Sequence, residues 1–359
     1  MQVSPVDSST AALEAVWQGA LGMLLMSVIA LIVVTMRRAA LQANSQKVER
    51  SRQELTRCFH AFLNSGVAFT KECLPQIGAL HFPLIMRIAL DITRSLKGDE
   101  RYRVVELLTL WGMEPYLHRT AQEGSRGKRI QALTLLGMFR DEPSYQILMS
   151  NAPHHDMYIQ MAALRGLALR APRADVPHII DLVIHAHSDM RNSLMLSDIL
   201  SLFGEAAVPD LIHLVRSEAV LEVRMAGVMA LGAIGSRQAV DVLIECAEEE
   251  GPLRARAIAS MAHIGDERAA YAIAAQLESY VTEVRLQAAI ALGKMKVIGT
   301  MPDLAVRLSD RDWWVRFRAA EALHRFGDVG VASLMAMARQ DNDAGLIARQ
   351  VLGELSGGV

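Results

Sequence analysis

The chain has 359 residues, and its 37 basic and 39 acidic side chains leave a formal net charge of −2. This near balance gives no strong positive field, so the composition excludes a nucleic-acid-binding protein. The three cysteines, Cys58, Cys73 and Cys246, form no metal-binding or disulfide spacing. We therefore expect them to be small apolar packing residues in a reducing compartment.

The first predicted element is a transmembrane helix at residues 15–36, a run that contains no charged residue. At 1.5 Å per residue it extends over about 33 Å, which is enough to cross a bilayer. Only Asp7 and Glu14 are charged before it, so it lacks the basic start of a signal peptide. Six basic and two acidic residues follow between positions 37 and 57, which places the later chain in the cytoplasm. The prediction is a single-pass protein of a bacterial inner membrane, with residues 1–14 as a short tail outside.

The next segment, residues 37–124, is predicted to form an amphipathic helix and a helical N-terminal cap. Residues 40–63 place Leu55, Phe59 and Phe62 on an apolar stripe among Gln, Lys, Glu and Arg. A helix pair follows at residues 85–96 and 102–110. We expect this cap to cover the exposed side of the first repeat.

A repeat occupies residues 125–355. Its arginine recurs at Arg224, Arg254, Arg285 and Arg316, a period of 30 to 31 residues. Such a unit holds one helix pair and cannot bury its own apolar face, so the units must stack into an α-solenoid. Small residues in the first helices allow close contact. A glycine follows the arginine by eleven residues at Gly235, Gly265 and Gly327, with Lys296 in that slot of the third copy, and Gly235 can end a first helix at a left-handed residue. Weaker copies start near residues 129, 160 and 193, and an unpaired helix from Asp343 closes the array.

The pattern Val-Arg-x-x-Ala-Ala-x-Ala-Leu-Gly, followed by Gly-Asp at Gly265 and Gly327, resembles the short bacterial HEAT-like repeat. The resemblance implies an all-α solenoid whose second helices line the concave face, which is the expected docking surface. Similar repeats occur in phycobilin lyases and deoxyhypusine hydroxylases. The hydroxylases hold their metal centre with His-Glu pairs, and none of the eleven histidines here precedes a glutamate. Because catalytic motifs are also missing, we expect a protein that is not an enzyme and has no cofactor.

Histidines supply the only candidate metal ligands, His154, His155, His185 and His187, in two loops that adjacent repeats bring together. Imidazole with Asp156 and Asp189 could hold zinc or sense pH. Alternatively, the aspartates are helix caps and the histidines are solvated. We favour the second interpretation, and therefore expect no metal site.

Two further sets of residues have competing interpretations. The arginines at 224, 254, 285 and 316 either form an anion-binding stripe or link neighbouring repeats through nearby acids, and we favour the second. Trp313 and Trp314 take slots that other copies fill in part with polar residues, so at least one indole should be exposed. With Arg311 and Arg318 they have the composition of a binding hot spot, or else they pad the junction to the next repeat.

The predicted function is a non-enzymatic, membrane-anchored scaffold that positions partner proteins on its repeats. The resemblance to membrane-anchored bacterial HEAT-repeat proteins favours an accessory factor of an exopolysaccharide synthesis or secretion complex, so the expected partner is a protein in a membrane complex. Two alternatives stay open. One is an anchor for a cytoplasmic signalling or motility complex, and the other is a lyase-like or metal-dependent enzyme.

Overall fold

A computed structural model describes residues 17, 23, 26–27, 30–38, 49–63, 81–93, 96, 99–170, 172–185, 193–217 and 220–356. Helices and short connections make up these ranges, with no strand among them. The chain divides into two compact units, residues 1–114 and 115–359, and each is described by itself.

The transmembrane helix predicted at residues 15–36 is not supported. Within the described ranges, no helix combines the length and the apolar character that crossing a membrane demands. Half of residues 15–36 and all of the predicted tail lie outside these ranges, and the continuous described helix there covers only residues 30–38, which end in Arg37 and Arg38. A span takes about 20 apolar residues. The transmembrane helix, the single-pass topology and the inner-membrane localisation are therefore corrected.

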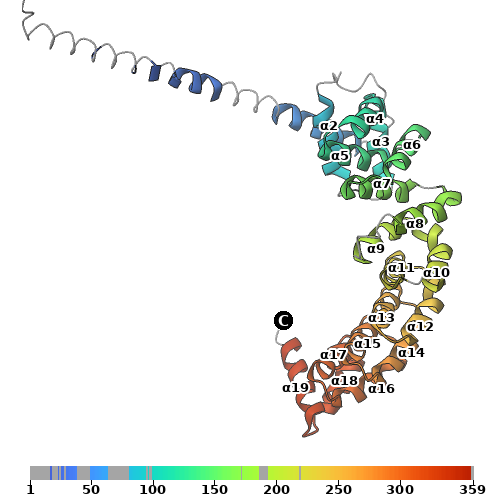
Figure 1. Ribbon diagram of the computed structural model, residues 1–359. Helices are drawn as coiled ribbons and strands as arrows, with labels where there is room; N and C mark the ends of the chain where they lie inside the picture. The colour runs from blue at the N-terminus through green and yellow to red at the C-terminus, as the bar shows by residue number, and fades with distance from the viewer. Residues whose placement is uncertain are drawn as a thin grey trace, which may run out of the picture. The chain divides into compact units, whose positions relative to one another are not determined.

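Between residues 49 and 114, the described part of the first unit is a small helical cluster (Figure 1). A helix at residues 49–63 buries Leu55, Phe59 and Phe62, the apolar stripe predicted from the sequence. Phe59 meets Trp111 edge-on, with ring centroids 5.3 Å apart, and the guanidinium of Arg103 donates to the carbonyl oxygens of Leu63 and Phe62. Its two further helices are α2 (Phe82–Thr93) and α3 (Asp99–Leu110), close to the predicted pair.

The second unit consists of stacked helix pairs (Figure 1). Helix α4 (Glu114–Glu123) begins at the unit boundary, so it goes with the repeats although the sequence placed it in the cap. The first helices of the pairs are α5 (Arg126–Leu136), α7 (Met157–Arg170), α9 (Ser193–Ser201), α11 (Leu221–Ile234), α13 (Pro252–Ile264), α15 (Thr282–Met295) and α17 (Trp313–His324). The second helices are α6 (Glu142–Asn151), α8 (Val176–His185), α10 (Val208–Ser217), α12 (Val240–Glu248), α14 (Glu267–Ala275), α16 (Met301–Val306) and α18 (Asp328–Ala338), and α19 (Asp343–Ser356) follows as a single helix. Short 3₁₀ helices flank several of the second helices, at Arg173–Asp175, Gly204–Ala207, Arg237–Ala239, Gln276–Glu278, Ile298–Thr300 and Arg307–Ser309. The all-α solenoid and its repeat registers are confirmed.

The first helices, rather than the predicted second helices, line the inner side of the stretch from α11 to α17 (Figure 1). Their small residues allow backbones to approach closely. A methyl group on Gly293 would lie 2.8 Å from Cα and Cβ of Ala322, and one on Gly232 would lie 2.6 Å from Cβ of Ser260. Second helices make fewer contacts with one another. Because the pairs are closest on the first-helix side, the array curves toward that side.

Cysteine placement agrees with a packing role where it is described. Cys246 is buried, and burial raises the pKa of its thiol to about 11. Cys58 is half-buried, and burial also raises its pKa. Both thiols are therefore protonated near neutral pH, and Cys73 lies outside the described residues.

The predicted left-handed helix ends occur at Gly235, Gly265 and Lys296, with φ of 81°, 71° and 56°. Gly327 differs, because α17 already ends at His324 and Gly327 precedes the first residue of α18 with φ 70° and ψ −144°. Lys296 is the only non-glycine residue with positive φ in the described part of the chain.

Replacing Lys296 with glycine is expected to raise the free energy of unfolding by about 1 kcal/mol, because the left-handed conformation strains a residue that has a Cβ atom. The greater flexibility of glycine in the unfolded chain offsets part of this gain. Urea denaturation of Lys296→Gly beside Lys294→Gly, a change inside the helix that should destabilise, measures the effect. If both variants lost the same free energy of unfolding, the predicted strain at Lys296 would be contradicted.

Candidate protein-binding surface

A buried ion pair joins α15 to the turn that follows the second helix of the same repeat, and its arginine also reaches the preceding repeat. Arg285 donates from Nε to Asp310 Oδ2 at 2.8 Å and from Nη2 to Asp310 Oδ1 at 2.9 Å, while Nη1 donates to the carbonyl oxygen of Ser279 at 2.9 Å. Both side chains are 4% exposed. Burial alone would raise the pKa of Asp310, but hydrogen bonds from Arg285 and from the Asp312 amide hold it below its ordinary value.

The other arginines of the predicted series act similarly at the ends of the preceding second helices. They donate to carbonyl oxygens that have no partner within their own helix. Arg224 donates to Val215, Arg254 to Glu248 and Glu249, and Arg316 to Asp310. Arg224 also forms two hydrogen bonds with the Glu249 carboxylate. Arg129 and Arg349, which the sequence did not place in the series, bond Ala121 and Ala338 in the same manner. The series thus links repeat to repeat.

Two acids close to these arginines in sequence, Asp310 and Asp312, make different contacts. Asp310 pairs with Arg285, as described above. Asp312 instead accepts hydrogen bonds from the amides of Trp314 and Val315, so it caps the start of α17. This cap begins the helix at Trp313 and thereby sets where the two indoles lie.

Helix α17 carries three aromatic side chains at its start. Trp313 is 37% exposed and Trp314 is 57% exposed, with ring centroids 4.7 Å apart and nearly perpendicular planes. The Trp313 ring stacks on Phe317, with centroids 5.2 Å apart and planes 13° apart. The three rings support one another, which keeps both indoles in defined positions with part of each in water.

Further along α17, a carboxylate lies between two arginines. Glu321 accepts from Arg318 Nη1 at 2.6 Å and from Arg325 Nη2 at 2.8 Å. Burial alone would raise the pKa of Glu321, but these two hydrogen bonds and the arginine charges lower it, so the group stays ionised at neutral pH. The three side chains line a hollow of about 200 Å³ between α15 and α17, with Ile290, Gly293 and Ala322 as its apolar part.

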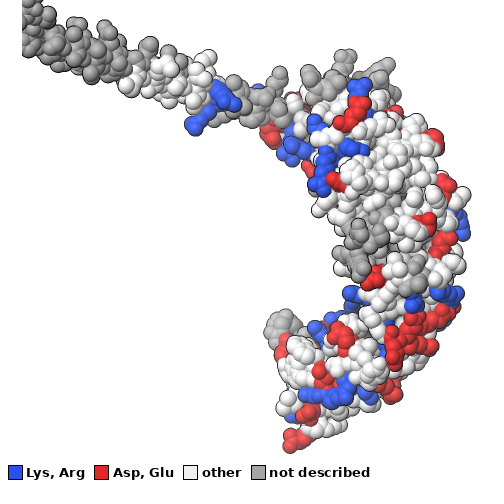
Figure 2. All heavy atoms as spheres, viewed as in Figure 1, with Lys and Arg blue, Asp and Glu red and all other residues white. Residues whose placement is uncertain are grey.

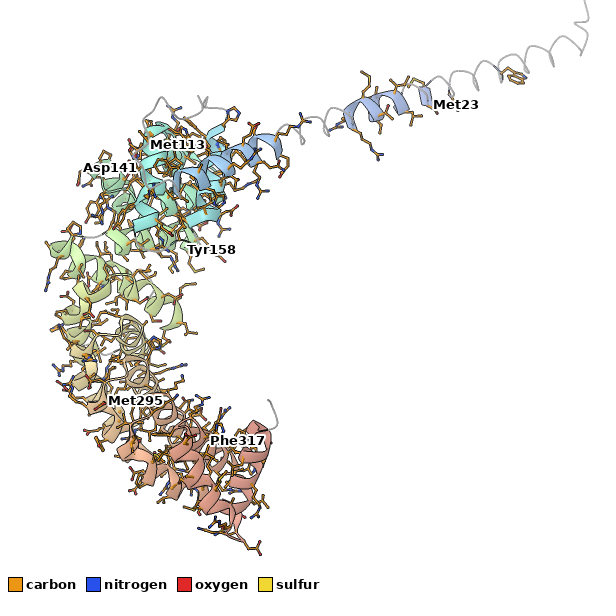
Figure 3. All side chains as sticks on the ribbon, turned by 180° about the vertical axis from the view of Figure 1, so that it is seen from behind. Met23, Met113, Asp141, Tyr158, Met295 and Phe317 are labelled. Carbon is orange, nitrogen blue, oxygen red and sulfur yellow. The ribbon has the colours of Figure 1, made fainter. Side chains whose placement is uncertain are left out.

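We call the exposed side of this helix the α17 surface, and it consists of Trp313, Trp314, Phe317, Arg318, Glu321 and Arg325. Positions 314, 318, 321 and 325 are spaced by three or four residues, so they follow one face of the helix. Phe317 is labelled in Figure 3, on the helix that packs against α15 ending at Met295. Arg311, which was predicted to join the site, instead donates to the carbonyl oxygen of Tyr280 at 2.8 Å.

Sequence reasoning identified four of the residues near this site and missed Phe317, Glu321 and Arg325. Phe317 lies four residues after Trp313 and Arg325 lies eleven residues after Trp314, so helical spacing from the tryptophans could have found them. Ile290 and Gly293 come from the previous repeat, and only the packing of α15 on α17 brings them to the hollow.

The candidate histidines do not come together as metal ligands in the described structure. His154 stacks on His155 with centroids 4.3 Å apart, and His154 Nδ1 accepts a hydrogen bond from the Asp156 amide. Burial and the charges of Arg129 and His155 lower the pKa of His154. His185 Nδ1 lies 3.1 Å from Asp181 Oδ1. No group of three or more His, Cys, Asp and Glu suited to a metal occurs among the described residues, which exclude His187 and Asp189.

Two other hollows lie between second helices. One, of about 250 Å³, is lined by residues of α14 and α16 that include Tyr271 and Arg307. The other, of about 230 Å³, lies between α8 and α10 beside His185 and His213. The helices around these two hollows carry no tryptophan, whereas α17 carries two exposed indoles together with the arginines of its own hollow, a combination typical of protein-binding sites.

Comparison with known proteins identifies the class of the repeats. Residues 194–262 and 272–353 match a family model for HEAT repeats, the class of repeat that the sequence resembles. No curated protein matches the chain.

Similar folds occur among solved structures. The complex of CpcE and CpcF of phycocyanin lyase from Nostoc sp. PCC7120 has 21% sequence identity over 60% of this chain and 88% of that chain, with a TM-score of 0.33. Human deoxyhypusine hydroxylase has 18% identity over 77% of this chain and 98% of that chain, with a TM-score of 0.29. Yeast importin-beta (Kap95p) has 14% identity over 74% of this chain and 45% of that chain, with a TM-score of 0.44. At these identities the likeness concerns the fold alone.

Proposed function

We propose that the repeat unit is a non-enzymatic scaffold that binds a partner protein through the α17 surface. The observation that carries the proposal is the pair of exposed indoles at the start of α17, about one helical turn before a hollow lined by two arginines. Tryptophan and arginine are the residues most enriched in binding hot spots, particularly next to pockets that a partner side chain can fill. The buried Arg285–Asp310 pair lies in the adjacent repeat junction and holds the surface in a defined shape before binding.

The test places a photo-crosslinking amino acid at position 314 of the full-length chain in its native cells. The control is position 158, because Tyr158 is the second residue of α7, as Trp314 is of α17, and is 54% exposed. Figure 3 labels Tyr158 in the earlier repeat. We expect a discrete crosslinked protein at 314 and none at 158. The joint change of Trp313 and Trp314 to alanine should abolish its capture without lowering the melting temperature by more than a few degrees. Equal crosslinking at both positions, or undiminished capture by the double variant, would refute the proposal.

The identity of the captured partner separates the finer predictions of function. A component of exopolysaccharide synthesis or secretion would favour the accessory role, and a signalling or motility protein would favour the alternative scaffold. Turnover of a substrate by the purified protein, or a tightly bound metal, would favour the lyase-like or metal-dependent enzyme. The features of the α17 surface support the scaffold and do not distinguish between its two versions.

A further inference from the structure

The inner side of the repeats is basic near the α17 surface. Repeat register places Lys294 of α15 at the position that Arg325 has in α17, and Arg256 of α13 at the position of Arg318. Lys294, Arg256 and Arg325 are all exposed. Two acids lie on this side, Glu283 at the register position of Trp314 and Glu321, and both oxygens of Glu321 already accept from arginine. The surface therefore attracts negatively charged groups.

The arginines of the α17 surface keep donors available, unlike those that link the repeats. Arg285 uses Nε, Nη1 and Nη2 on protein acceptors. Arg318 uses Nη1 on Glu321, and Arg325 uses Nη2. A guanidinium has five N–H donors, so most donors of Arg318 and Arg325 have no acceptor among the described residues. Carboxylates of a partner can accept from them in the two-bond geometry that arginine favours.

The hollow between the two helices has room for one apolar side chain. Its volume, about 200 Å³, is below the range of about 300–1,000 Å³ typical of sites for small organic ligands. Ile290, Gly293 and Ala322 give it an apolar part, and Gly293 keeps it open because a larger residue there would collide with Ala322. The indoles of Trp313 and Trp314 lie on the same helix, so they can cover a chain that runs along it.

The outer side of the same unit has the opposite charge. Figure 2 shows acidic side chains gathered over α12 and α14. Residues of α12 and of the turn after it make up most of this patch, and the exposed acids there are Asp241, Glu245, Glu248, Glu249 and Glu250. An acidic partner is repelled by this side and attracted to the inner side, which also disfavours a nucleic acid that follows a continuous basic track.

We infer that the α17 surface binds a short acidic segment of its partner protein. One apolar side chain of that segment enters the hollow at Ile290 and Gly293, and flanking carboxylates accept hydrogen bonds from Arg318 and Arg325. The inference rests on the proposed function, since it gives the chemistry of the partner that the scaffold would bind at this site.

The experiment measures binding of short synthetic peptides to the full-length protein by isothermal titration calorimetry. The probe carries one leucine between glutamate and aspartate residues. One matched peptide replaces the acids with lysine, and another replaces the leucine with serine. We expect the probe to bind at least tenfold more tightly than either, and its affinity to fall as NaCl is raised. Equal binding of the lysine peptide, or tighter binding of a single-stranded oligonucleotide, would overturn the inference.

Variants locate the site and separate folding from binding. Joint charge reversal, Arg318→Glu with Arg325→Glu, should weaken probe binding by tenfold or more, whereas Arg165→Glu, an exposed arginine on α7, should leave it unchanged. Glu321→Gln removes the internal competitor for both arginines and should strengthen binding severalfold, a gain that misfolding cannot produce. Unchanged or weaker binding by Glu321→Gln would contradict the inference. If crosslinking at position 314 still captures a protein while the acidic probe fails to bind, the scaffold stands and the acidic segment is refuted.

Discussion

Arg285→Ala is expected to lower the free energy of unfolding of the repeat unit by about 3–5 kcal/mol, because it leaves the buried Asp310 carboxylate without its two-bond partner and with only the more distant Arg307, whose Nη1 lies 3.9 Å from Oδ2. Each of the two side chains is 4% exposed, and Arg285 also donates a hydrogen bond to the Ser279 carbonyl oxygen of the preceding repeat. Urea denaturation followed by circular dichroism measures the loss. Arg216→Ala is the matched control, since Arg216 makes the same two-bond contact with Glu245 while both side chains are about half exposed. That pair should contribute about 0 to 1 kcal/mol. If Arg285→Ala and Arg216→Ala lowered the free energy of unfolding by similar amounts, burial would not determine how much the Arg285–Asp310 pair contributes.

The same pair predicts a pH dependence. Because the folded pKa of Asp310 lies below its ordinary value, the contribution of this carboxyl is present above its unfolded pKa of about 3.9 and is lost as pH falls through the folded pKa. Stability should therefore decrease below about pH 4, and this decrease should be smaller in Asp310→Asn, which cannot bind that proton. If the free energy of unfolding fell by the same amount below pH 4 in the unchanged protein and in Asp310→Asn, Asp310 would not be the group responsible.

Gly137→Ala is expected to lower the free energy of unfolding by about 1–3 kcal/mol, because the added methyl group collides with the neighbouring first helix. Its Cβ would lie 2.4 Å from Cα of Gly166, a backbone atom that no rotamer change can move. The control is Gly127→Ala in the same helix, where the added Cβ meets open space. That change should be neutral or stabilise by up to about 1 kcal/mol, because alanine is the better helix former. Equal melting temperatures for the two variants would show that α5 and α7 can separate without loss.

Local patterns were sufficient for the repeat boundaries. Val223, Ala226, Ala230 and Leu231 are buried because helical spacing puts them on one side of α11. The recurring arginine gave the register of four first helices, and the same period gave the weaker copies at residues 129, 160 and 193. Lys296 was placed in a glycine slot from the period alone, and it has the backbone conformation of that slot. The register predicted that at least one of Trp313 and Trp314 is exposed, since other copies fill these slots in part with polar residues, and both indoles are partly exposed.

Relations between repeats were harder to predict, since each depends on how helices pack. Arg285 has acids close in sequence, yet its partner lies 25 residues away, at the end of the next second helix. The inner side of the array was assigned to the wrong helices, because the close approach of Gly293 to Ala322 appears only when α15 packs on α17. The membrane prediction was wrong for a related reason. The absence of charge in residues 15–36 is a property of composition and does not establish a membrane-spanning helix. The continuous helix described there covers residues 30–38 only.

The sequence by itself determined the helix pairs, their period and the two tryptophans at the start of α17, because these depend on residues within about one turn or one repeat of each other. Only the tertiary structure decided which side of the array is hollowed, which acid pairs with Arg285, and that Ile290 and Gly293 meet Arg318 and Arg325 around one hollow. Those features arise from contacts between neighbouring repeats, whose geometry depends on a few ångströms of helix packing that no single repeat encodes.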